Sequence, residues 1–122
     1  PLDKALSALI EDIHNRGLQE KIMVVVCGEM GRSPKVNAKG GRDHWGNLGP
    51  LLLSGGGLNM GQIVGQSATD GGTPATHAVT NSNLMSTIMH TLMDIGSLRI
   101  ARGMPREMVQ HIAGASPIEE LM

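Results

Sequence analysis

Two short segments of the sequence hold side chains that could bind an anion or a metal ion. The first, GEMGRSP, places Glu29 and Arg32 directly after an apolar run that ends at Cys27. A carboxylate at that position could bind a metal ion or act as a base, and an arginine could hold an anion through two parallel hydrogen bonds. The alternative interpretation is an ordinary solvated Glu–Arg ion pair, which position alone favours.

The second segment, GGRDHWG, spans residues 40–46. Asp43 and His44 place a carboxylate beside an imidazole, a combination suited to zinc or a similar metal ion. Arg42 adds a further anion contact, and the two glycines allow the backbone to approach a ligand closely. The neighbouring Trp45 is the single tryptophan of the chain and indicates an anchored loop. The alternative is that these are unspecialised loop residues, because an adjacent Asp–His pair is a weak motif by itself.

The other histidines and the single cysteine give weaker functional signals. His77 is predicted in a loop and could approach the same site, whereas His14 and His90 fall on predicted helices, where packing or surface roles are commoner. Cys27 ends an apolar strand, which predicts an inert buried thiol. One cysteine excludes an internal disulfide.

The elements that must position these residues can be predicted from hydrophobic patterns. Residues 2–16 repeat apolar side chains on one face and are followed by Gly17, which predicts an amphipathic helix with a glycine stop. The unbroken apolar run over residues 22–27 is typical of a strand buried on both faces of a parallel sheet. The long polar loop over residues 28–47 then follows the carboxyl end of that strand, where open α/β sheets bind ligands.

Further elements are predicted after this loop. They are short strands at residues 50–53 and 62–64, a loop at 66–79, a helix at about 83–94 and a helical turn that begins at Ser116. We expect the helix to bury Leu84, Ile88 and Leu92 as one stripe. The glycine-rich segment after the first of these strands reads GxGxxxG and precedes a predicted strand, so it is predicted to be a tight connection and not a phosphate loop.

Composition excludes several classes of protein. The net charge of −1 argues against a general nucleic-acid binder, and an aromatic content of 1% leaves no platform for stacking bases. No apolar run approaches the roughly 20 residues that a membrane helix needs. Hydrophobic residues make up 40% of the chain, with nine methionines and no phenylalanine or tyrosine, so the core is predicted to be aliphatic and adaptable.

The order of these motifs resembles the C-terminal part of the alkaline phosphatase superfamily, which includes the sulfatases. The segments GEMGRSP, GRDHW, LLLSGGG, MGQIVG, DGG and PIEEL are, in this order, similar to those of a bacterial family known as domain of unknown function 1501, often described as sulfatase-like. The resemblance implies an α/β fold: the C-terminal portion of a three-layer α/β/α fold, an incomplete sheet with flanking helices. Residues 1–122 are then a single domain or a fragment of one.

The resemblance also implies a partial metal site. Glu29 falls where the superfamily has a metal-binding aspartate, and His44 matches its late metal-binding histidine. Asp43 would be a further ligand or would orient one, while Arg32 and Arg42 would bind the anionic group of the substrate. The catalytic nucleophile lies in the N-terminal half of that fold, so we do not expect it in this chain.

The implied activity is metal-dependent hydrolysis of a phosphoric or sulfuric ester, with zinc, calcium or magnesium as the divalent metal. We expect no turnover from this chain alone, and association with the missing N-terminal half or with itself. The residues of this chain do not indicate a location, and the family resemblance implies a periplasmic or secreted one. The alternative is a non-catalytic module that binds anions, glycans or proteins on a degenerate hydrolase scaffold. Met30 favours it, because Met30 falls where the superfamily has a metal-binding histidine. A third possibility is an isolated fragment without activity.

Overall fold

The computed structural model covers the backbone of residues 1–122 and describes all side chains except those of Arg99 and residues 111–113. It mixes helices with two small sheets, as the predicted α/β class requires. The chain divides into two compact units, each built from separate segments. The first unit contains Pro1–Met23, Gly55–Gln62 and Val79–Met122, and the second contains Val24–Ser54 and Ile63–Ala78.

Helix α1 (Leu2–Asn15) confirms the predicted N-terminal helix. Its last turn carries an ion pair between Arg16 Nε and Asp12 Oδ2 at 2.9 Å. Gly17 follows with φ 66°, the left-handed conformation in which glycine replaces other residues at little cost.

Helix α2 (Asn81–Leu92) confirms the predicted second helix but buries a different face. Its first turn is closed by a capping box: the Thr80 hydroxyl accepts a hydrogen bond from the backbone N–H of Asn83, and the Asn83 side chain accepts one from the backbone N–H of Thr80. The predicted leucine and isoleucine stripe is only partly covered: Leu84 and Ile88 are half-buried, whereas Leu92 is 64% exposed. The fully buried residues are instead Ser86 and Thr87, whose hydroxyls find hydrogen-bond partners inside the unit.

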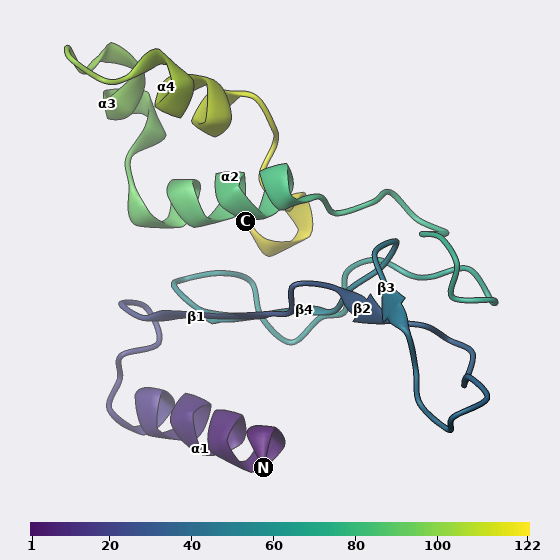
Figure 1. Cartoon of the computed structure of the whole chain (residues 1–122). Coiled ribbons are helices and arrows are strands. Elements are labelled where there is room, and N and C mark those ends of the chain that lie inside the picture. Colours follow the sequence, from purple (N-terminus) through teal and green to yellow (C-terminus); the bar gives the residue numbers. More distant parts are fainter. The chain divides into compact units, whose positions relative to one another are not determined.

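Three shorter helical elements follow α2: α3 (Ile95–Ile100), α4 (Arg106–Ala113) and the 3-10 helix η1 (Glu119–Leu121). The helical turn predicted from Ser116 therefore begins at Glu119 instead. Helix α4 contacts both α2 and α3, as Figure 1 shows. The buried apolar side chains of the whole chain are few among the described residues: Ile13, Ile95, Ile118 and Leu121.

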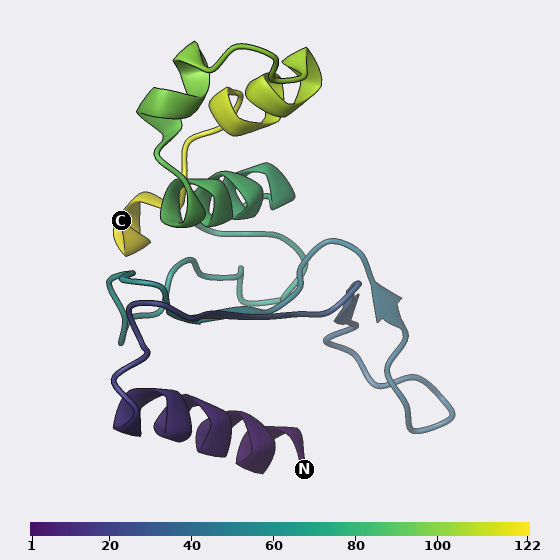
Figure 2. The same cartoon turned by 90° about the vertical axis from the view of Figure 1, so that its left-hand side faces the viewer.

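We call residues 115–121 the C-terminal strap, because they return to α2 after α4 (Figure 2). Three side chains of α2 hold the strap by its backbone. The hydrogen bonds are Asn83 Nδ2 to Ser116 O at 2.9 Å, Ser86 Oγ to Ala115 O at 2.8 Å and Ile118 N to Thr87 Oγ1 at 2.8 Å. The strap also contacts the glycine-rich turn over residues 54–61, where Asn59 N donates a hydrogen bond to Leu121 O at 2.8 Å.

The first sheet pairs β1 (Met23–Cys27) with β4 (Leu51–Gly55). The pair is antiparallel, with the end of β4 beside the start of β1, where Gly56 N donates to Ile22 O at 3.0 Å. The predicted parallel pairing was therefore wrong. An unbroken apolar run indicates a covered strand, but it does not specify the direction of the neighbouring strand.

The second sheet lies inside the segment predicted as an unstructured polar loop. It pairs β2 (Gly31–Arg32) with β3 (His44–Trp45) in an antiparallel hairpin. The strand predicted at residues 62–64 is absent, because the described backbone forms neither strand nor helix there. None of the helices described here is long and apolar enough to cross a membrane.

Candidate functional site: an exposed Arg–His pair on the β2–β3 hairpin

The β2–β3 hairpin brings together one residue from each of the two candidate segments. Arg32 lies directly opposite His44, and Gly31 lies opposite Trp45. Residues opposite one another in an antiparallel pair point to the same face, and successive residues alternate between faces. Arg32 and His44 therefore share one face, and both are exposed.

The opposite face of the hairpin is packed against its own chain. Gly31 is buried, and a Cβ built there would overlap the carbonyl oxygen of Leu48. Trp45 is half-buried, and its Nε1 is enclosed without a hydrogen-bond partner among the described atoms. The tryptophan thus anchors the hairpin, as the sequence predicted, and leaves the arginine and the histidine on the open side.

The loop between the two strands is organised by Asn37. Its Oδ1 accepts hydrogen bonds from the backbone N–H groups of Lys39 and Gly41, each at 3.0 Å, and its Nδ2 donates to Asp43 Oδ1 at 2.8 Å. Sequence reasoning did not select Asn37. The available signal was an asparagine followed by a glycine pair, because asparagine side chains hydrogen-bond to the backbone two residues ahead in turns.

Arg42 closes the same loop from its other end. Its Nη1 donates to Ser33 O at 2.7 Å and to Pro34 O at 2.5 Å. The guanidinium therefore clamps the backbone, and only its remaining N–H groups could meet an anion. The role of Arg42 in substrate binding stays a prediction, beside this structural role that the sequence did not reveal.

Arg32 has no acidic partner among the described side chains. The ordinary alternative for Glu29 and Arg32 was a solvated ion pair, yet the described part of the chain holds a single ion pair, Arg16–Asp12 on α1. Glu29 is exposed two residues before β2. The positive charge of Arg32 is thus uncompensated, which leaves it available for an external anion.

The predicted metal ligands do not form a complete site by themselves. Glu29, Asp43 and His44 are all exposed, and the Asp43 carboxylate already accepts from Asn37. Across the described side chains, no group of three or more His, Cys, Asp or Glu is placed to hold a metal ion. Protein zinc sites use at least three such ligands and calcium sites use six to eight oxygens, so a metal bound here would need additional ligands.

Comparison with known proteins identifies the family. The model of the family described as protein of unknown function (DUF1501) matches residues 1–122. The chain belongs to the DUF1501 family. No curated protein and no solved structure matches the sequence. The family match confirms the family resemblance that the motif order suggested, and it assigns no activity.

A second loop of the DUF1501 chain lies against the hairpin segment. Asn47 Nδ2 donates to Gly72 O at 3.1 Å, and a Cβ at Gly71 would come within 2.9 Å of Pro34 Cγ. The same loop carries Asp70, whose Oδ1 accepts from Gly72 N at 2.8 Å. The hairpin is therefore supported by residues from outside its own segment.

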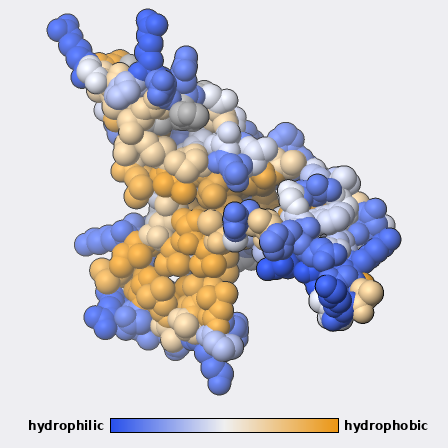
Figure 3. All heavy atoms as spheres, in the orientation of Figure 1, coloured by the Kyte–Doolittle hydropathy of each residue, from blue (hydrophilic) through white to orange (hydrophobic). Residues whose placement is uncertain are grey.

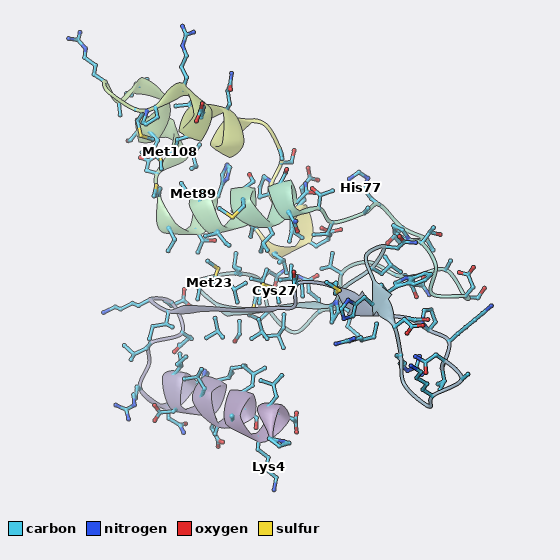
Figure 4. All side chains as sticks on the ribbon, viewed as in Figure 1. Lys4, Met23, Cys27, His77, Met89 and Met108 are labelled. Carbon is cyan, nitrogen blue, oxygen red and sulfur yellow. The ribbon has the colours of Figure 1, made fainter. Side chains whose placement is uncertain are left out.

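The two remaining candidates lie at exposed positions of the DUF1501 chain (Figure 4). His77 lies exposed on the segment that precedes α2, and its approach to the site stays a prediction. Cys27 is exposed at the end of β1, so the prediction of a buried thiol was wrong. The strand ends at this residue, and its side chain meets solvent where the polar loop begins.

Proposed function

We propose that the DUF1501 chain binds the anionic group of a phosphoric or sulfuric ester on the exposed face of its β2–β3 hairpin. The observation that carries the proposal is the register that sets Arg32 opposite His44, with no carboxylate paired to the arginine in the described part of the chain. Arginine presents a planar fork of N–H donors that matches two oxygens of such a group, and an imidazole N–H can meet a third.

The wider proposal is that this hairpin belongs to a metal-dependent ester hydrolase of the alkaline phosphatase and sulfatase type. The motif order supports this wider proposal. In it, the chain forms the C-terminal portion of a three-layer α/β/α fold. In that setting Arg32 would orient the ester, and Glu29 and His44, with Asp43, would hold a zinc, calcium or magnesium ion together with ligands from outside this chain. The nucleophile also comes from outside this chain, and we predict no turnover for the 122 residues alone.

Anion binding can be tested by calorimetric titration of the protein with inorganic sulfate and with phosphate. Replacing Arg32 with glutamine removes charge-assisted hydrogen bonds, so we expect the Kd to rise about tenfold. Arg106→Gln is the matched control, because Arg106 is also exposed but lies on α4. The proposal is wrong if neither anion binds saturably, or if the two variants lose the same affinity.

The metal part of the proposal needs a separate measurement. When the ligands from outside this chain are supplied, we expect the bound metal content to fall in Glu29→Ala and in His44→Ala, while His14→Ala, which changes an exposed histidine on α1, keeps it. Hydrolysis of aryl phosphate or aryl sulfate that a chelator abolishes would support the enzyme once the missing ligands are supplied. A metal-free protein whose variants behave like the parent would contradict this part.

A second function is favoured by two specific observations. The described residues hold no group of three metal-ligating side chains, and Met30 stands where the resembled superfamily has a histidine. Both features suit a non-catalytic module that keeps anion or glycan binding on a degenerate hydrolase scaffold. Saturable binding of a sulfated glycan without turnover, when metal and the ligands and nucleophile from outside this chain are all supplied, would support the module over the enzyme.

A further inference from the structure

The loop that connects β2 and β3 carries positive charge that nothing in the described structure neutralises. We call residues 33–43 the cationic loop. Lys35 and Lys39 are exposed and have no ion pair among the described side chains. The loop's own acid, Asp43, accepts from Asn37 at 2.8 Å, and Asp70 of the adjacent loop accepts from the Gly72 N–H.

The cationic loop has a defined shape despite its exposure. The Asn37 side chain accepts hydrogen bonds from the backbone N–H groups of Lys39 and Gly41, and Arg42 Nη1 donates to the carbonyl oxygens of Ser33 and Pro34. On the face in view, Figure 3 shows mainly hydrophilic surface over this segment. A loop that is already ordered loses less conformational entropy on binding than a flexible one, so its lysines are preorganised for a ligand.

The chain also limits the kind of anion that this surface can hold. It contains no phenylalanine or tyrosine, and the one tryptophan, Trp45, faces the packed side of the hairpin. Binding of single-stranded nucleic acid relies on aromatic side chains on which bases stack. The surface therefore has no platform for unstacked bases, and its charge pattern fits a polymer recognised through its repeated anionic groups alone.

We propose that the cationic loop is a second anion-binding surface, so that the ligand of the hairpin is a linear polyanion with repeated sulfate or phosphate groups. One anionic group of the polymer binds at Arg32, and neighbouring groups of the same polymer bind at Lys35 and Lys39. This inference rests on the proposed function of Arg32. Because linked contacts act at a high effective concentration, the polymer binds more tightly than a single ion without requiring any new kind of contact.

The test compares three ligands on the same protein by calorimetry: inorganic sulfate, a heparin-derived oligosaccharide and inorganic polyphosphate. We expect at least one polymer to bind ten times more tightly than sulfate or better, with a steep dependence on salt concentration. The double variant Lys35→Gln/Lys39→Gln should lose most of that gain while its affinity for sulfate stays within about twofold. Which polymer binds identifies the sulfated or the phosphate-containing source.

A control variant with the same loss of charge separates this surface from a general charge effect. Lys4→Gln/Lys21→Gln also removes two exposed lysines, but outside the cationic loop, and should keep the gain. The inference is wrong if the polymers bind no more tightly than sulfate, or if both double variants lose the same polymer affinity. In either case the proposed function still stands if Arg32→Gln weakens sulfate binding. A protein that binds none of the three ligands would overturn both.

Discussion

Two regions of the chain that are held by side-chain hydrogen bonds use their polar groups in opposite ways. Between α2 and the C-terminal strap, the hydroxyls of Ser86 and Thr87 are fully buried and each has a partner. On the β2–β3 hairpin, Arg32 and His44 are exposed, and the arginine has no acidic partner among the described residues. The polar groups of the first region are bonded to other parts of the same chain, whereas those of the second are available to an external ligand.

This difference indicates where the chain keeps its shape and where it can meet a ligand. A buried hydroxyl that is fully satisfied stabilises one arrangement, and losing its partner exposes the full cost of desolvation. An uncompensated exposed charge adds little to stability, yet it can bind an external anion. Polar residues on α2 should therefore matter for folding, and those on the hairpin for binding.

The largest effect should come from Gly31→Ala on the packed face of the hairpin. The added methyl group would overlap the Leu48 carbonyl oxygen, which is backbone and cannot turn away. We expect the paired strands to separate, at a cost of about 3 kcal/mol or more in the free energy of unfolding. Denaturant unfolding and sulfate titration would both report the change.

Gly46→Ala is the control for this substitution on the same hairpin. A Cβ at Gly46 meets no atom within 4 Å, and its φ is not positive. Its stability and sulfate affinity should match the parent protein. If both alanine variants behave alike, the hairpin is not packed as described.

A smaller loss is expected from Thr87→Val in the strap region. Valine keeps the shape of threonine but leaves the buried Ile118 N–H without its acceptor, which costs about 1–3 kcal/mol. Thr91→Val is the control, since Thr91 Oγ1 donates only to the Thr87 carbonyl within the same helix. Thermal unfolding should show a lower melting temperature for Thr87→Val than for Thr91→Val, while sulfate binding stays unchanged in both. Weaker sulfate binding by folded Thr87→Val would contradict the separation of a stabilising region on α2 from a binding region on the hairpin.

The next effect concerns the loop that Asn37 organises. Asn37→Ala removes an acceptor for two backbone N–H groups and the donor to Asp43. Because these groups are near solvent and water can replace the side chain, we expect a loss of only about 1 kcal/mol in stability. We expect a larger relative loss in affinity for the polyanion than for sulfate. Equal losses for both ligands would show that the order of the loop is irrelevant to polymer binding.

The smallest effect should be a pH dependence at the start of α3. Hydrogen bonds from the Ser97 hydroxyl and backbone N–H lower the pKa of Asp94 below its ordinary value of 3.8. A carboxyl whose folded pKa is lowered adds stability above its unfolded pKa, and that contribution is lost as the pH falls through the folded pKa. Asparagine also caps helices but does not titrate. Between pH 5 and pH 2 the free energy of unfolding should therefore fall slightly more in the parent protein than in Asp94→Asn. Parallel plots of this free energy against pH for the two proteins would contradict the prediction.

Much of the helical framework could be predicted from the sequence, because its signals are local. Apolar periodicity predicted α1 and α2, and the apolar run predicted β1. The antiparallel pairing of β1 could not be predicted, since the pattern of one strand does not encode its partner. The buried face of α2 was also missed, because Ser86 and Thr87 are satisfied by the strap about 30 residues later in the chain.

The candidate site was predicted in its residues and not in its geometry. Motif chemistry selected Arg32 and His44 separately, but strands of two residues have no periodicity from which a register can be predicted. Nothing local distinguished the clamp of Arg42 from a substrate contact. Asn37 was overlooked although its partners lie within six residues, because the motif search selected charged and metal-ligating side chains and not turn-forming amides.

The central claim is that the exposed face of the β2–β3 hairpin binds an oxyanion while the strap region does not. Titration of isotope-labelled protein with sulfate, followed by backbone amide chemical shifts, tests it directly. The account predicts saturable shifts at Arg32, His44 and their neighbours, their loss in Arg32→Gln, and unchanged signals along α2 and residues 115–121. Shifts spread evenly over the chain, or shifts at the hairpin that survive in Arg32→Gln, would contradict it.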